Sequence, residues 1–458
     1  MQLLYRRCAG LDVHEKSVTA CIRRRGKGSS DVECEEAVFG TFTQELLRLR
    51  KWLRQHGVRE VVMESTGVYW IPVWNVLEGR GLHLMLVNPA TVRAPRGRKT
   101  DRIDARRLAE YLQYGLLNGS FVPSRHVRQL RELTRMRVHV QQDRNRVINR
   151  IGRLLETVNI KLSAVASNIV GASGEAMLRA LAAGVRSPET LANKARGVLR
   201  GKIPQLTAAL DGRPDAHFEW MLNRLLEKLD WLDEELAGID QQLDERMSDY
   251  ADLIRRLDTI PGVDVIVAQA IIAETGTDMT QFPDAAHLAS WAGLCPGNAE
   301  SAGKRFSGRT RKGDRYLRRI LVQSAWAAAH TNGCFLQSLF FRIARRRGEK
   351  KACVAVAHRI ATIIWKIIRD GGIYEEAGAD FFDRIRPERT ARKLTRRLQR
   401  IGFEVEIKRR PIDPVPPDQV VPADICGKCH GWRLGQCIHH NPRPIRKRRP
   451  RKPLESQG

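Results

Sequence analysis

Four acidic residues near the start of the chain have the residue type and placement that metal-dependent phosphodiester chemistry requires. Asp12 and Glu64 each end a short apolar segment, and Asp101 and Asp104 lie three residues apart in KTDRIDARRLAEYL. A spacing of i and i+3 places two helical side chains on one face. Converging carboxylates repel one another unless cations lie between them, and oxygen ligands favour Mg²⁺ or Mn²⁺. The pattern therefore predicts a metal site that can activate one phosphodiester oxygen and stabilise another.

Each of these acids also has a simpler interpretation. Asp12 would be a turn residue and Glu64 a surface acid, while Asp101 and Asp104 would stabilise a helix N-terminus capped by Thr100. The placement of all four together favours the metal site. The basic residues beside the aspartate pair are then predicted to contact phosphate: Arg98, Lys99, Arg102, Arg106 and Arg107.

A second group lies in 296-PGNAESAGKRFSGRTRKGDRYLRR-319, where glycines and short polar residues predict a loop or hairpin. Ser301 could attack a phosphodiester, which requires a proton acceptor and cations to stabilise the developing charge. No base is evident nearby, so composition alone favours a loop that contacts the DNA backbone, with Asp314 capping the helix that follows. The predicted phosphate contacts in this group are Lys304, Arg305, Arg309, Arg311, Lys312 and Arg315.

A third group lies in 426-CGKCHGWRLGQCIHH-440 and has the residue types of a Zn²⁺ site. Its candidate ligands are Cys426, Cys429, Cys437 and either His439 or His440. The alternative is a set of incidental reduced cysteines, and the other six cysteines are scattered as reduced thiols would be. If zinc binds, we expect a small module that contacts RNA or DNA together with the basic tail at 443–452.

The charge of the chain indicates a polyanionic partner, for which nucleic acid is the default. The 79 Lys and Arg residues outnumber the 51 Asp and Glu residues, which leaves a formal net charge of +28. No apolar run is long enough to span a bilayer, and the N-terminus lacks the features of a signal peptide. These observations predict a cytoplasmic protein without a membrane partner.

The elements that must position the acids are predicted within 1–125. Apolar segments and turn residues indicate three strands, a helix, a strand, a helix, a strand and a helix. An antiparallel meander followed by βαβ crossovers is the order of the ribonuclease H-like fold. In such a sheet the strand ends that carry Asp12 and Glu64 are neighbours.

Residues 126–250 carry heptad patterns that predict a coiled coil. An antiparallel hairpin within one chain satisfies the patterns as well as a dimer does, and Arg137 and Arg144 weaken the first run. The two runs are Leu130, Leu133, Arg137, Val140, Arg144, Val147, Ile151, Leu154 and Val158, then Phe218, Leu222, Leu225, Leu229, Leu232, Leu236, Ile239 and Leu243. The residues between the runs read as helical and polar.

Residues 251–372 are predicted to be mostly helical, with a helix-hairpin-helix at Pro261 and Gly262. The backbone N–H groups of this hairpin can face a phosphate, so Gly262 is a predicted nucleic-acid contact. Residues 373–458 are predicted to be a basic C-terminal extension with a proline-rich linker and no clear core pattern.

Several segments together resemble the DEDD transposases of bacterial insertion sequences, which are described as bridge-RNA-guided serine recombinases. The resemblance covers roughly 5–120 and 250–370, in the family's order and with the coiled coil between them. The segments are GLDVHEKSV, VVMESTGVYW, LVNPATVRAPRGRKTDRIDARRLAEYL, LDTIPGV, LASWAGLCPGNAESAGKRFSGRTRKGDRYLRRILV and RRLQRIGFEVEI.

The resemblance implies roles for the residues that match the family's motifs. Asp12, Glu64, Asp101 and Asp104 match its metal-binding tetrad, in a domain similar to the RuvC Holliday-junction resolvase. Ser301 matches its nucleophile, in a C-terminal transposase domain, and the implied intermediate is a 5′-phosphoserine. The implied site combines the tetrad of one subunit with the serine of another.

The resemblance also implies partners. A noncoding guide RNA would pair with both donor and target double-stranded DNA, leaving the protein to read mainly backbone and shape. We expect the protein to act as a homo-oligomer, a dimer or a tetramer joined through the coiled coil, in the bacterial cytoplasm and associated with the nucleoid. Two alternatives stay open: a RuvC-like nuclease that hydrolyses DNA with a metal, and a basic nucleic-acid-binding scaffold without catalysis. A scaffold does not explain four grouped acids.

Overall fold

We describe the chain from a computed structural model that covers residues 3–26, 32–65, 67–89, 101–297, 299–301, 304–307 and 309–408. The chain divides into two compact units, Met1–Pro123 and Ser124–Gly458. Within the described residues, no helix has both the length and the apolar character needed to cross a membrane.

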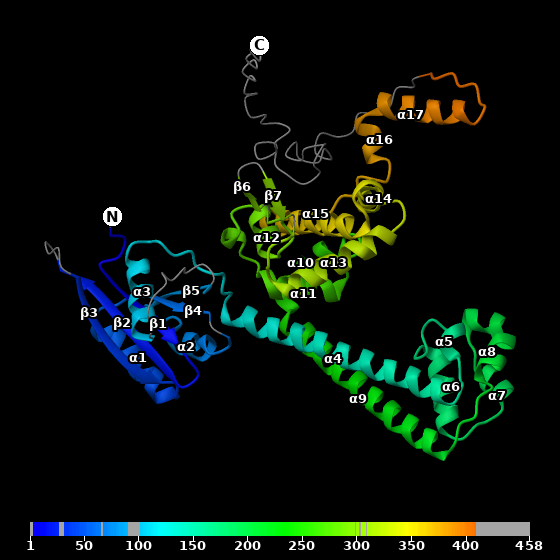
Figure 1. The fold of residues 1–458 in the computed structure, drawn as a ribbon, viewed down its shortest axis with the longest axis horizontal. Helices are drawn as coiled ribbons and strands as arrows, with labels where there is room; N and C mark the ends of the chain where they lie inside the picture. The colour runs from blue at the N-terminus through cyan, green and yellow to red at the C-terminus, as the bar shows by residue number, and fades with distance from the viewer. Residues whose placement is uncertain are drawn as a thin grey trace, which may run out of the picture. The chain divides into compact units, whose positions relative to one another are not determined.

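The first unit is built on a five-stranded mixed sheet with the order β3-β2-β1-β4-β5 (Figure 1). The strands β1 (Arg7–Val13), β2 (Ser17–Arg25) and β3 (Val32–Gly40) form an antiparallel meander. The strands β4 (Glu60–Glu64) and β5 (His83–Val87) then add in parallel beyond β1. This is the connectivity that the sequence predicts and that is typical of a ribonuclease H-like domain.

Helices cover both faces of this sheet. On one face, α1 (Thr43–Gln55) and α2 (Trp70–Leu77) pack against the side chains of β1 residues Ala9, Leu11 and Val13. On the other face lies α3 (Asp101–Gln113), whose Leu108 and Leu112 pack against Cys8 and Val62. Side chains alternate between the two faces along a strand, so the even-numbered residues of β1 point toward α3.

Gly10 brings α3 unusually close to β1. A Cβ atom at this position would lie 2.3 Å from the carbonyl oxygen of Ala105 and 2.5 Å from the amide nitrogen of Ala109. Only glycine allows the helix backbone to rest on the strand at this distance. The position of α3 is therefore set by main-chain contact.

The second unit begins with a pair of long antiparallel helices, α4 (Arg125–Thr157) and α9 (Ala216–Arg246). Arg137 pairs with Asp240, and Arg144, seven residues later on α4, pairs with Asp233, seven residues earlier on α9. Both arginines use two nitrogens to bind two carboxylate oxygens. The seam arginines are thus neutralised, and the heptad pattern is satisfied within one chain.

Short helices cross the far end of this pair and close a core with it. The sequence suggests a polar stretch here, but Met177, Leu178, Leu181 and Leu206 are buried together with Phe218 of α9. The core is hard to recognise from the sequence because these segments are rich in alanine and few of their residues are strongly apolar. The elements are α5 (Leu162–Val165), α6 (Ala172–Ala182), α7 (Pro188–Ala192), the 3₁₀ helix η1 (Gly197–Lys202) and α8 (Ile203–Leu210).

The remaining described residues of the second unit, which end at residue 408, are mostly helical and include one short hairpin. The helix α15 packs against α10, α12, α13 and α14, and Phe381 of α16 packs edge-on against Phe335 of α14 with ring centroids 4.9 Å apart. The helices are α10 (Ala251–Asp258), α11 (Val265–Thr275), α12 (Ala285–Trp291), α13 (Arg315–His330), α14 (Phe335–Arg347), α15 (Glu349–Asp370), α16 (Phe381–Ile385) and α17 (Pro387–Arg400), with 3₁₀ turns η2 (Ser248–Tyr250) and η3 (Met279–Gln281).

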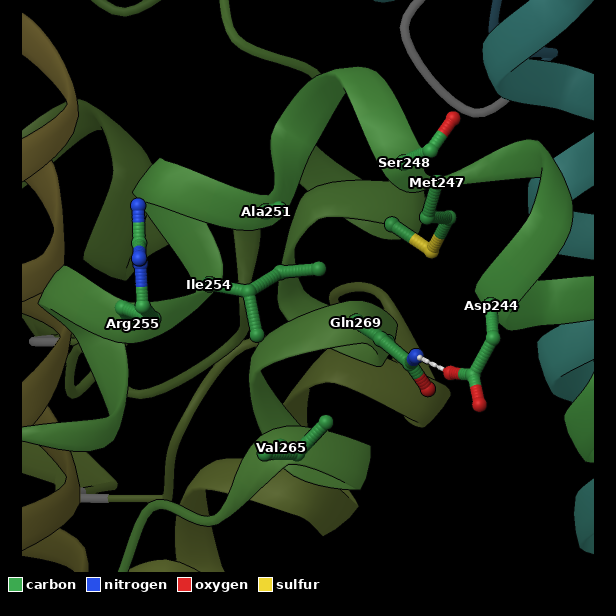
Figure 2. A pocket seen from close by; sticks show the side chains of 8 residues that line it. All are labelled: Asp244, Met247, Ser248, Ala251, Ile254, Arg255, Val265 and Gln269. Carbon is green, nitrogen blue, oxygen red and sulfur yellow. Dashed lines mark hydrogen bonds between the residues drawn. The ribbon is translucent and has the colours of Figure 1, made fainter.

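A pocket lies where the end of α9 meets α10 and α11 (Figure 2). Its lining includes Met247 and Ile254, and Gln269 donates a hydrogen bond of 2.8 Å to Oδ1 of Asp244. Because these two polar groups already bind each other, they serve to join α11 to α9.

Candidate functional site

The acidic site begins at the end of β1. Asp12 is an even-numbered residue of this strand, so it shares the α3 face with Cys8 and Gly10. Its side chain is buried, with the residue only 6% exposed. A carboxylate in this position is costly unless a cation or hydrogen-bond donors accompany it.

The register between β1 and β4 places Glu64 beside Asp12. In the parallel pairing, Gly10 is opposite Val62 and Leu11 is opposite Met63, so Asp12 and Glu64 are the next residues on the two strands. Val62 packs toward α3, and alternation along the strand puts Glu64 on the same face. Glu64 is half-buried. The predicted proximity of the two acids is therefore supported by the register.

The helix α3 supplies the other two acids from its first turn. Asp101 is 59% exposed, whereas the Asp104 side chain is 13% exposed and lies 3.4 Å from Nη1 of Arg107. Burial of Ala105 and Leu108 fixes which face of α3 meets the sheet. Among the described residues, Asp12 and Asp101 belong to a group whose ligand atoms lie within 4.8 Å of one another, while Glu64 and Asp104 lie outside that closest group.

His14 is the third member of this group, and the sequence did not single it out. Its Nε2 lies 3.2 Å from Oδ2 of Asp12 and 3.5 Å from Oδ1 of Asp101. The signal was available in the motif Asp-x-His, since residues two apart at a strand end lie on one face. His14 thus adds a candidate nitrogen ligand to a set otherwise made of carboxylates.

The electrostatics of the group are those of carboxylates crowded together. Burial raises the pKa of Asp12, and the nearby carboxylates Asp101 and Asp104 raise it further, while His14 lowers it. A divalent cation would reduce the repulsion between carboxylates in this arrangement. The oxygens of Asp12, Glu64, Asp101 and Asp104 fit Mg²⁺ or Mn²⁺. The residues present therefore fit the metal site predicted from the sequence.

The predicted phosphate contacts around α3 differ in their surroundings. Arg102 and Arg106 are exposed on the first turns of the helix. Arg107 is half-buried and pairs with Asp104, so it also orients one of the acids. Arg98 and Lys99, with the predicted cap Thr100, lie outside the described residues.

Ser301 lies in the described hairpin of the second unit. The strand β6 (Ala299–Ser301) pairs with β7 (Lys304–Ser307), and Ser301 is opposite Lys304. Glu300 is opposite Arg305, with an irregularity between Ala299 and Glu300. The serine is thus the last residue of its strand, at the end of the hairpin that lies away from α12 and α13.

The base of this hairpin is closely packed. A Cβ atom at Gly313 would lie 2.3 Å from the amide nitrogen of Gly293, so the two glycines hold the incoming and outgoing chains together. Pro296 forms a bridge with Thr310. Arg318 of α13 donates to the carbonyl of Gly293 and, at 2.7 Å, to Oγ1 of Thr310. Asp314 caps α13, as predicted.

Most of the cations that the sequence predicts as phosphate contacts here lie at the base of the hairpin. The four whose side chains are described, namely Arg309, Arg311, Lys312 and Arg315, are exposed. Lys304 and Arg305 are residues of β7. A cationic surface at the base of the serine hairpin suits the binding of a phosphodiester.

Gly262 lies in the turn between α10 and α11 with φ of +83°, and a Cβ there would meet the carbonyl oxygen of Ser324 at 2.2 Å. This glycine therefore allows the turn to approach α13. Asp264 caps α11 by accepting from the amide of Val267. The phosphate contact at Gly262 stays a prediction. Cys426, Cys429, Cys437, His439 and His440, with the basic tail, lie outside the described residues.

Two family models match the chain. Residues 9–160 match the model for DEDD transposases of the IS110 type, described as a transposase. Residues 254–338 match a model described as the transposase IS116/IS110/IS902 family. The first match contains all four predicted metal ligands, and the second contains Ser301.

Individual proteins are also similar to parts of this chain. The transposase for insertion sequence element IS1111A of Coxiella burnetii is 26% identical over 317 residues, which are 67% of this chain and 77% of that protein. The insertion element IS110 uncharacterized 43.6 kDa protein of Streptomyces coelicolor is 34% identical over 121 residues, 26% of this chain and 29% of that protein. The structure of RuvC from Thermus thermophilus aligns with 25% of this chain and 99% of its own, at 16% identity and a TM-score of 0.21.

Proposed function

Because the chain belongs to the DEDD transposase family of IS110-type insertion sequences, we propose that it cuts and rejoins DNA through two chemically distinct sites. One is the carboxylate group at the ends of β1 and β4, and the other is the serine hairpin. The observation that carries the proposal furthest is the buried Asp12, whose pKa is raised by burial, by Asp101 within 4.8 Å and by Asp104.

Asp12, Glu64, Asp101 and Asp104 would hold Mg²⁺ or Mn²⁺. When bound, such an ion neutralises phosphate charge and makes an oxygen that it holds easier to deprotonate. The positions of these residues are set by the fold. Asp12 and Glu64 are fixed by strand register, and Asp104 is oriented by Arg107. The exposed Arg102 and Arg106 would bind the backbone on either side of the scissile phosphate.

Ser301 is the proposed nucleophile. Its Oγ forms a bond to phosphorus while the bond from phosphorus to the 3′ oxygen breaks, which leaves a 5′-phosphoserine and a 3′-OH. The serine proton passes to a carboxylate of the acidic site, and the departing 3′ oxygen takes up a proton. Attack by another 3′-OH on the phosphoserine joins the strands and restores the serine. The cations at the hairpin stabilise the charge on phosphorus.

We place sequence choice in a guide RNA that pairs with donor and target DNA. The chain carries a formal charge of +28, which suits contact with several nucleic-acid backbones at once. Sequencing the RNA that copurifies with active protein tests this part. An active complex free of RNA would remove the guide and leave the transposase proposal intact.

Ser301→Ala tests the nucleophile. We expect the variant to bind DNA and to lose both strand cleavage and the covalent protein–DNA product seen after denaturation. If Ser301→Ala still cleaves, with water as the attacking group, the enzyme is a hydrolytic nuclease of the resolvase kind. The observation that favours this second candidate is that Asp12, His14 and Asp101, whose possible ligand atoms lie within 4.8 Å of one another, all belong to the first unit.

A mixing experiment tests whether the two sites work in different subunits. We propose that the acids of one subunit act on the serine of another, so Asp104→Ala and Ser301→Ala proteins should each be inactive alone and regain part of the activity when mixed. Mixtures that stay inactive, while wild-type protein mixed with either variant stays active, would refute the shared site.

A further inference from the structure

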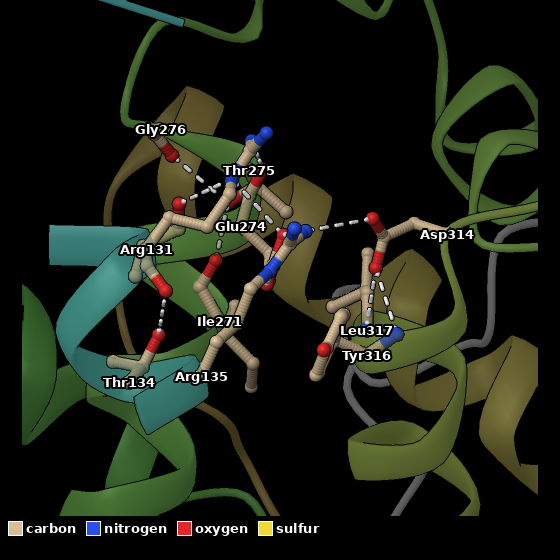
Figure 3. Close-up of polar contacts among 11 residues, drawn as sticks. Arg131, Thr134, Arg135, Ile271, Glu274, Thr275, Gly276, Asp314, Tyr316 and Leu317 are labelled. Atoms are coloured by element: carbon tan, nitrogen blue, oxygen red, sulfur yellow. Dashed lines mark hydrogen bonds and ion pairs between the residues drawn. The ribbon is translucent and has the colours of Figure 1, made fainter. Parts of the chain in front are cut away.

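A buried network of charged side chains joins three helices of the second unit (Figure 3). Glu274, near the end of α11, is only 1% exposed on its side chain. Arg135 of α4 binds both of its oxygens, with Nε to Oε1 and Nη2 to Oε2 each at 2.8 Å. Such a two-point contact fixes the orientation of the guanidinium as well as its position.

Arg131, one helical turn before Arg135, strengthens the same junction. Its Nη2 donates to the carbonyl of Glu274 at 2.6 Å and its Nε to the carbonyl of Ala273 at 3.2 Å. These carbonyls belong to the last turn of α11, where cations are favoured. With Arg131 holding the main chain of α11 and Arg135 the carboxylate, α4 and α11 form one rigid joint.

Arg135 also contacts a second carboxylate. The same Nη2 lies 3.2 Å from Oδ2 of Asp314, the residue that caps α13. Asp314 uses its other oxygen, Oδ1, to accept from the amides of Tyr316 and Leu317 at 3.0 and 2.8 Å. The guanidinium also lies over the ring of Tyr316, 4.2 Å from its centroid.

Asp314 is the point where the serine hairpin rejoins the helical scaffold. Its amide donates to the carbonyl of Trp291, at the end of α12, and Gly313 before it packs directly on Gly293. Arg318, one turn along α13, binds Gly293 and Thr310 on the two sides of the hairpin. A shift of Asp314 therefore shifts both chains that support Ser301.

We propose that Arg135 is a positioning residue for Ser301: it holds the base of the serine hairpin to the long helix α4 through Asp314, with Glu274 as its buried anchor. The inference rests on the proposed function, because it assigns Arg135 an effect on the reactivity of that serine. It also assigns α4 a role at the site, since a movement of α4 relative to α11 would release the hairpin base.

The substitutions are chosen to distinguish an effect on the position of Ser301 from an effect on the folding of the protein. Arg135→Met removes both pairs, Arg135→Lys keeps one charge without the two-point contact, and Asp314→Asn keeps a capping oxygen while removing the charge that Arg135 binds. The matched control is Arg144→Met, which breaks a comparable two-point pair on the same helix but away from the hairpin.

Two rates are measured on folded protein: covalent protein–DNA product at saturating DNA, and trypsin cleavage after Lys304 or Arg305. We expect each of the three variants to form product about 10- to 100-fold more slowly at nearly unchanged DNA affinity, since misplacement of a reacting group by about 1 Å has effects of this size. Trypsin should cut the hairpin faster in these variants, and Arg144→Met should match wild type in both rates.

The double variant Arg135→Met/Asp314→Asn should be no slower than the slower single variant, because the two substitutions break one interaction. Unchanged product formation and trypsin cleavage in Arg135→Met, with Ser301→Ala inactive, would overturn the inference and leave the proposed function standing. If Ser301→Ala stays active, the proposed function fails, and the trypsin rates alone then decide whether Arg135 holds the hairpin.

Discussion

The carboxylate group and the serine hairpin reach their geometry by different means. The carboxylates are placed by the main chain: strand register sets Asp12 beside Glu64, and backbone contact at Gly10 sets α3. The hairpin base has a main-chain contact between Gly293 and Gly313, but the side chains of Arg135 and Arg318 join it to α4 and α13. Main-chain placement resists most substitutions, whereas a hairpin held by a few charged groups can be loosened by one change. The geometry of the carboxylate group is therefore expected to tolerate most substitutions, whereas the geometry of the serine hairpin can be changed by a single one.

Loss of an acid should have the largest effect. Asp104→Ala or Asp101→Ala should reduce strand cleavage by about a thousandfold or more, because a bound metal contributes several kcal/mol to transition-state stabilisation. Folding and most nucleic-acid affinity should persist, which circular dichroism and a DNA-binding titration can check. The control is Asp143→Ala, which removes an exposed acid paired with Arg146 on α4. An Asp104→Ala protein that fails to fold would return the acid to a structural role.

Next in size is the buried anchor of the hairpin base. Glu274→Ala should lower the free energy of unfolding by about 3–5 kcal/mol, because it leaves Arg131 and Arg135 without their buried partner. Urea unfolding of the purified variant measures this. Glu227→Ala is the matched control: Glu227 and Arg224 form an exposed pair, worth about 0–1 kcal/mol. Equal effects of the two substitutions would show that the buried network is not what stabilises this junction.

The main-chain contact at Gly10 can be broken with a single methyl group. Gly10→Ala should lower the free energy of unfolding by about 1–3 kcal/mol and reduce cleavage, because the new Cβ would force α3 away from β1. Gly238→Ala is the opposite control, since nothing lies within 4 Å of its added Cβ on α9. That substitution should stabilise the protein by about 0.5–1 kcal/mol. A Gly10→Ala protein with wild-type stability and activity would mean that α3 is not fixed there.

The smallest effect concerns thiols at the same interface. Burial raises the pKa of Cys8 and of Cys21 to about 12, so neither should form a thiolate near neutral pH. Cys34 on β3 is exposed. Iodoacetamide at pH 8 followed by mass spectrometry should modify Cys34 first and spare the other two while the protein is folded. Rapid modification of Cys8 would indicate that α3 leaves the sheet, contrary to a main-chain-fixed site.

The contrast between main-chain placement and side-chain contacts also explains which features the sequence could predict. The strand order and the neighbouring ends at Asp12 and Glu64 follow from local patterns of apolar and turn residues. His14 follows Asp12 by two residues at a strand end, so its place on the same face could have been predicted, whereas its distances to Asp12 and Asp101 required the structure. The network of Arg135, Glu274 and Asp314 joins residues 139 and 179 positions apart, for which no local pattern exists.

Arg137 and Arg144 show the limit in another way. Their positions in the heptads predict a weakened seam, yet each is neutralised by an aspartate on α9. A pattern of apolar residues identifies the helix face that packs. The charges that complete that face come from a partner helix which the pattern does not identify.

The antiparallel pairing of α4 and α9 has a consequence for length. Because successive ion pairs are seven residues apart on both helices, removing seven residues from α4 and the facing seven from α9 deletes one pair and keeps the other in register. The pair would shorten by about 10 Å, at 1.5 Å per residue, while the chain enters and leaves at the same end. These two helices are therefore a spacer that can be lengthened or shortened in steps of one heptad without moving the helices that hold Ser301.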